Sequence, residues 1–90
     1  MDKILSFVIR DDKFYLALRS QDGDSTAVLA YERQEGSLFP FRNFGKKGTY
    51  TIPEKMVLSV NIAGNGDVVY VKKGLHTLRD GNDIISLKGN

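Results

Sequence analysis

The 90-residue chain contains no cysteine. A disulfide framework, a thiolate nucleophile and a cysteine-based zinc site are therefore all excluded. Its single histidine, His76, stands in no motif that supplies a nucleophile or an orienting carboxylate, which a histidine base would need. We expect a protein that is not an enzyme and that uses no metal or other cofactor.

The chain also lacks a long apolar run. The early run from Ile4 to Ile9 is too short for the core of a signal peptide, and the charges Arg10, Asp11 and Asp12 follow it at once. Nothing is long enough to cross a bilayer. We expect no membrane partner and a cytoplasmic location, either cellular or in the host cytoplasm if the protein is viral.

Neither sign of charge is in large excess, since 13 Lys and Arg against 11 Asp and Glu give a formal net charge of only +2. Residues 1–32 hold four Lys and Arg against six Asp and Glu, whereas residues 33–90 hold nine against five. The second part is therefore the basic one, and an excess of this kind favours polyanions without resembling the dense tails of dedicated nucleic-acid binders.

Hydrophobic residues recur with period two almost throughout, which is typical of strands. The alternation predicts extended segments near residues 5–10, 14–19, 26–32, 49–52, 56–62, 67–73, 75–79 and 83–88. Turn residues separate them, above all Asn65-Gly66, which predicts a hairpin. The chain is thus predicted to be all-β: one domain, residues 1–90, forming a small barrel or a two-sheet sandwich of about six to eight short antiparallel strands. The barrel is preferred because closure removes exposed edges.

Residues 33–48 interrupt the alternation and are predicted to form the longest loop. Aromatic rings and cations are mixed there, as on surfaces that bind single-stranded nucleic acid, where bases stack on rings and cations meet phosphates. Our main hypothesis is a non-catalytic domain that binds nucleic acid or another polyanion. The residues predicted to form this site in the loop are Phe39, Phe41, Arg42, Phe44, Lys46 and Lys47, with Lys72, Lys73 and Arg79 extending it if the later strands lie beside the loop.

The same three phenylalanines have a purely structural interpretation. They can fold back and plug an open end of the domain, leaving the lysines solvated. The sequence leaves both interpretations open.

A different class of function is suggested by apolar residues on both faces of several strands. Tyr15, Ala17, Val68 and Tyr70 stand opposite the residues predicted to face the core, such as Phe7, Phe14 and Leu16. If they lie together outside, they form a patch that implies a protein partner or a homo-oligomer. Pro53 adds a possible open sheet edge for a partner's strand. The alternative hypothesis is therefore a small protein-binding or self-assembling module, such as a viral or regulatory accessory protein.

Asp22-Gly23-Asp24 has a faint likeness to a calcium loop. The alternating ligands, closing glutamate and flanking helices of such a loop are missing. Local turn formation explains these aspartates without a metal.

Overall fold

The computed structural model describes residues 2–73 and 82–88, and the regular elements of this part are all β-strands. In chain order they are β1 (Lys3–Arg10), β2 (Lys13–Arg19), β3 (Thr26–Gln34), β4 (Ser37–Pro40), β5 (Thr49–Ile52), β6 (Val57–Ile62), β7 (Asp67–Lys73) and β8 (Asn82–Lys88). Every pairing between them is antiparallel. The prediction of an all-β domain is confirmed.

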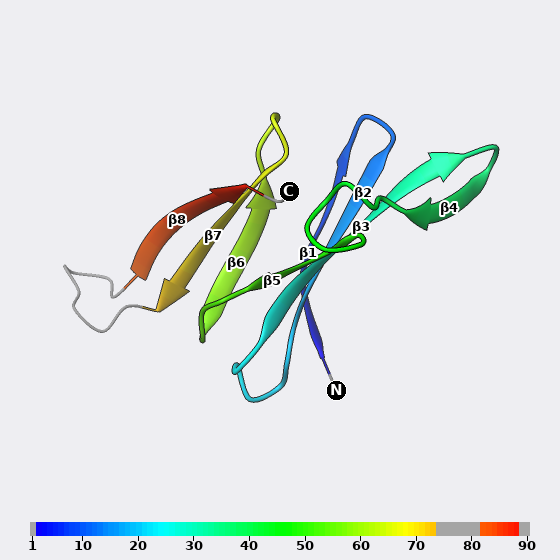
Figure 1. Ribbon diagram of the computed structural model, residues 1–90. Helices are drawn as coiled ribbons and strands as arrows, with labels where there is room; N and C mark the ends of the chain where they lie inside the picture. The colour runs from blue at the N-terminus through cyan, green and yellow to red at the C-terminus, as the bar shows by residue number, and fades with distance from the viewer. Residues whose placement is uncertain (1, 74–81, 89–90) are drawn as a thin grey trace.

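The strands form two sheets, which Figure 1 shows side by side. The first has the order β1-β2-β3-β4, and β5 also pairs with β3, along the half of β3 that β4 leaves free. The second has the order β6-β7-β8. Within the described residues no strand pairing joins the two sheets, so the two-sheet alternative holds and the preferred closed barrel does not.

The sheets approach each other where β1, an edge strand of the first, lies against β6, an edge strand of the second. Arginine side chains connect them there: Arg10 and Arg19 each donate to a backbone carbonyl of β6.

A single hydrophobic core lies between the sheets. Its buried members are Tyr15, Ala17, Val28, Ala30, Phe44, Ile52, Val57, Val60, Ile62, Val68 and Tyr70. The prediction for the two faces of these strands is therefore wrong. Tyr15, Ala17, Val68 and Tyr70 face the core, and Phe7, predicted to face it, is 58% exposed.

Two irregular strand pairings change which side chains point inward. In β1 the register shifts between Ile4 and Ser6, so Leu5 packs against the core while Phe7 and Ile9 point away from it. In β6 a shift between Val57 and Ser59 buries Val57 and leaves Leu58 exposed. One extra residue in a strand reverses the face of every residue beyond it, and strict alternation cannot anticipate this.

The predicted loop at 33–48 is shorter than expected, because β3 runs on to Gln34 and residues Ser37–Pro40 form strand β4. Gln34 pairs with Ser37, so only Glu35 and Gly36 connect β3 to β4. Both have positive φ, 50° and 83°, the backbone of a two-residue type I′ hairpin turn.

At the other end of the chain, β8 pairs with β7. The strand predicted near 75–79 lies outside the described residues. The described part of the chain holds no helix of the length and apolarity needed to cross a membrane.

Candidate functional site

The outer face of the five-stranded sheet, on the side away from the core, is apolar across three adjacent strands. We define this outer face by its residues on β1, β2 and β3: Ile4, Phe7, Ile9, Phe14, Leu16, Leu18, Ala27, Leu29 and Tyr31. No charged side chain is among these nine positions. Leu38 and Pro40 of β4 and Thr49 and Thr51 of β5 continue the face with further uncharged residues.

The strand register aligns these side chains in rows across the sheet. One row is Phe7, Leu16 and Leu29, because Phe7 pairs with Leu16 and Leu16 with Leu29. Residues paired in this way have neighbouring side chains on the same side of the sheet. The rings of Phe7 and Phe14 stack with centroids 6.1 Å apart. The nine residues therefore form one continuous patch.

The outer face is exposed most strongly along β1. Ile4, Phe7 and Ile9 are 62%, 58% and 54% exposed. The β2 and β3 members are half-buried by their neighbours, and no described element packs over them. Large contiguous apolar patches are uncommon on small soluble domains, and this makes the outer face a candidate interaction site.

The residues predicted from the loop divide into inward and outward sets. Phe44 is in the core, only 2% exposed, and its ring meets that of Tyr15 edge to face with centroids 5.2 Å apart. Phe41 is half-buried against the same core, and the ammonium of Lys13 lies 4.8 Å from its ring centroid. The plug interpretation therefore describes Phe44, and Phe41 in part.

The backbone of residues 41–48 holds these rings in place by folding back on β3. The Phe41 amide donates to the carbonyl of Ala30, and the Ala30 amide donates to the carbonyl of Gly48. Phe44 donates its amide to the carbonyl of Phe41. The segment is a tight connection with its own hydrogen bonds.

The outward set consists of Phe39, which is 47% exposed, and the exposed cations Arg42, Lys46 and Lys47. Lys72 and Lys73 are not beside them. The β7 end at Asp67 lines the same cleft as Phe41 and Phe44, whereas Lys72 and Lys73 lie at the opposite end of that strand. Six residues of strand span about 20 Å.

Lys72 also has a partner of its own, since its ammonium lies 2.9 Å from a carboxylate oxygen of Glu54. Arg79 and His76 fall outside the described residues. Of the predicted cationic site, Phe39 and Arg42 line one shallow hollow, and Lys46 and Lys47 are exposed further along the same connection.

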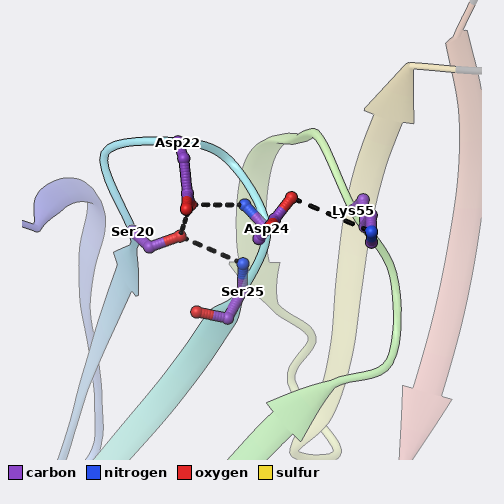
Figure 2. A network of polar contacts seen from close by, with 5 residues as sticks. All are labelled: Ser20, Asp22, Asp24, Ser25 and Lys55. Atoms are coloured by element: carbon purple, nitrogen blue, oxygen red, sulfur yellow. Dashed lines mark hydrogen bonds and ion pairs between the residues drawn. The ribbon is translucent and has the colours of Figure 1, made fainter.

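The Asp22-Gly23-Asp24 turn is held by local hydrogen bonds, as Figure 2 shows. The Ser20 hydroxyl and the Asp24 amide donate to one carboxylate oxygen of Asp22 at 2.6 and 2.9 Å. The Ser20 hydrogen bond, then that of Asp24, keeps the pKa of Asp22 below its usual value. Asp24 faces Lys55 at 3.9 Å. Within the described residues no three His, Cys, Asp or Glu side chains gather in a way that would hold a metal ion.

Comparison with known proteins adds no family to this description: no family model, curated protein or solved structure matches the chain. The sequence predicted an apolar exterior patch but assigned Tyr15, Ala17, Val68 and Tyr70 to it, because β1 and β2 are apolar on both sides. The available signal was the number of apolar residues in these two strands, because a single core can cover only one face of each strand.

Proposed function

We propose that this chain is a non-catalytic protein-binding module and that the outer face is its contact surface. The observation that carries the proposal is the uncharged array on β1, β2 and β3, most exposed at Ile4, Phe7 and Ile9. Interface cores are distinguished from the rest of a protein surface by few charges and many aromatic residues, and the outer face has this composition. Because the chain has no cysteine, the fold of such a module does not depend on disulfides and would not be altered by the reducing cytoplasm.

Burial of this face would release a substantial free energy. Phe7, 58% exposed, leaves on the order of 100 Å² accessible, and at about 25 cal/mol per Å² its burial contributes about 2 to 3 kcal/mol. Several such side chains lie next to each other. Their joint burial can offset the entropy lost on association, which no single exposed residue can do.

The polyanion hypothesis has less support, because it needs rings and cations on one surface. Phe44 is buried in the core, and Lys72 and Lys73 lie at the far end of β7. What favours it still is that the exposed ring of Phe39 and the cation Arg42 line one hollow, and that Lys46 and Lys47 are exposed on the same connection. We keep it as a second candidate, a weak site for single-stranded nucleic acid made of these four residues.

The second candidate is tested by fluorescence anisotropy with labelled single-stranded DNA and RNA at low salt. Binding that falls with added salt, with a slope of about 0.7 for each phosphate contacted, is expected if the site exists. The triple variant R42A/K46A/K47A should then abolish it, while Lys55→Ala, an exposed cation elsewhere, should not. No binding by the unaltered chain at low salt removes this candidate.

The main proposal is tested by photo-crosslinking in the cells that naturally contain the protein. A benzoylphenylalanine at position 7 reports on the outer face, and one at Leu58, which is 42% exposed on the other sheet, is the matched control. Adducts of defined mass at position 7 and none at position 58 are expected. If position 7 gives no adduct with any protein, the outer face is not a contact surface and the proposal fails.

A further inference from the structure

We infer that the partner seated on the outer face is a second copy of this chain, packed face to face about a two-fold axis that runs along the strands. The inference rests on the proposed function, and it identifies the occupant. Shape, charge and area of the face each support it.

The shape of the outer face is complementary to itself. Its projecting side chains are Ile4, Phe7 and Ile9, all on the edge strand β1. A shallow hollow of about 390 Å³ lies at the end of the face where β2 turns into β3, lined by Leu18, Ala27, Leu29 and Thr51 and, at its rim, by Asp2, Ser20, Ser25 and Thr26. A two-fold axis parallel to the strands and near the centre of the face lays β1 of each copy over β3 and β5 of the other. This axis keeps each residue at its level along the strands, so Ile4, which shares a row with Leu18 and Ala27, enters the hollow of the partner, twice, as an isologous interface requires.

The distribution of charge also suits a second copy. With no charged side chain among the nine central positions, pairing the face with itself brings no like charges into contact. The charges that border one end are of opposite sign: Asp11 and Asp12 in the turn between β1 and β2, and Arg33 on β3. The same axis brings Arg33 of each copy toward the other copy's acidic turn. A partner recognised by charge would require charges on the face itself.

The size of the face is close to what a stable dimer needs. Ile4, Phe7, Ile9 and Leu38 are each more than half exposed, and side chains of this kind leave on the order of 100 Å² each. With the half-buried positions between them, the face approaches the roughly 800 Å² that one partner contributes to a standard interface. Two sheets packed in this way lie about 10 Å apart, as in a sandwich.

The first test is the mass of the purified full chain by sedimentation equilibrium at about 0.1 mM. A mass twice the 10.1 kDa of one chain is expected. Phe7→Asp should halve that mass, because it buries an unpaired charge in the apolar interface. Leu58→Asp, an equally drastic change on an exposed residue of the other sheet, should leave the dimer intact. Circular dichroism of both variants establishes that they fold, and Phe7→Ser is the milder substitute if the aspartate variant does not.

The second test fixes the arrangement and uses the absence of cysteine, which gives a clean background. Phe7→Cys mixed with Thr49→Cys should join into heterodimers with a short bis-maleimide linker, because β1 lies over β5 of the partner. Phe7→Cys mixed with Leu58→Cys should not.

The outcomes separate this inference from the function on which it rests. A monomeric wild-type chain, or a dimer that Phe7→Asp does not weaken, overturns the second copy as occupant. If the chain is monomeric and position 7 crosslinks in cells to a different protein, the binding function stands and only the inference fails. If the chain is monomeric and position 7 crosslinks to nothing, both fail.

Discussion

The guanidinium of Arg10 donates two hydrogen bonds to the carbonyl oxygen of Ile62, from Nε at 3.2 Å and from Nη2 at 3.0 Å. At the other end of β6, Nη1 of Arg19 donates to the carbonyl oxygen of Val57 at 2.7 Å. The two arginines therefore join the sheets at both ends of β6, along a boundary where the described strands of one sheet do not pair with those of the other.

These contacts predict that Arg19→Ala destabilises the domain by about 1 to 3 kcal/mol, because hydrogen bonds to charged donors contribute this much and the carbonyl of Val57 loses its partner. Arg10→Ala should cost about 1 kcal/mol, since Arg10 is more exposed than Arg19. Urea unfolding measures both.

Arg42→Ala is the control: this exposed side chain makes no hydrogen bond or ion pair with described residues, and its loss should change stability by less than about 0.5 kcal/mol. Equal stabilities of the Arg19 and Arg42 variants would contradict the bridging role.

Gly45 occupies a position that only glycine fits. Its φ is +56°, and a Cβ there would collide with the backbone carbonyl of Thr49. We predict that Gly45→Ala lowers the free energy of unfolding by about 1 to 3 kcal/mol. Gly64→Ala is the matched control, because open space surrounds that position and its φ is not in the left-handed range. Thermal unfolding of the two variants checks the difference, and a Gly45 variant as stable as the Gly64 variant would show that the 41–48 connection adapts freely.

The alternation of residues was enough to predict the strands, but it could not decide which face they bury. In β2, Phe14, Leu16 and Leu18 look at least as suited to a core as Tyr15, Ala17 and Arg19. The deciding facts are tertiary: the second sheet covers the Tyr15 side, and Arg19 points the same way to reach β6. Bulges in β1 and β6 then shifted further residues between faces, and a single-residue bulge leaves no clear mark in a sequence of apolar residues.

The residues of the predicted binding loop do not share one surface, and the reason is again tertiary packing. Phe39, Phe41 and Phe44 look alike in the sequence, but their surroundings differ. Phe39 pairs with Glu32 on the exposed hairpin of β3 and β4, whereas the turn after Phe41 directs Phe44 between the sheets. The hairpin was missed because its turn is Glu35-Gly36 and not one of the common Asn-Gly or Asp-Gly pairs.

This difference predicts opposite responses to the same substitution. Phe44→Ala removes a ring that is 2% exposed and packed against Tyr15, and should cost about 3 to 5 kcal/mol. Phe39→Ala, at 47% exposure, should cost less than about 1 kcal/mol. Chemical unfolding gives both values. A Phe44 variant that keeps wild-type stability would mean that this ring is not part of the core, and the prediction that the loop is a contact surface would again be open.

Tyr70 predicts how stability depends on alkaline pH. Burial, and next the negative charge of Glu54, raises its pKa from 10.0 to about 12. Burial also raises the pKa of Tyr15. Between pH 10 and about 12 the unfolded chain loses the Tyr70 proton while the folded chain keeps it, so the unfolded state gains free energy by ionising and stability falls. The contribution is fully present below pH 10, and its loss is on the order of 2 kcal/mol once pH passes the folded value.

Urea unfolding at intervals from about pH 9 to about pH 11.5 measures this loss, with Tyr70→Phe as the comparison. The variant lacks the titrating hydroxyl, so its stability should fall less steeply with pH, while the ionisation of lysines affects both proteins alike. Because Tyr15 shifts in the same direction, some decline should remain in the variant. Parallel curves for the two proteins would show that the Tyr70 hydroxyl ionises as readily in the folded chain as in the unfolded one, and that water reaches it between the sheets.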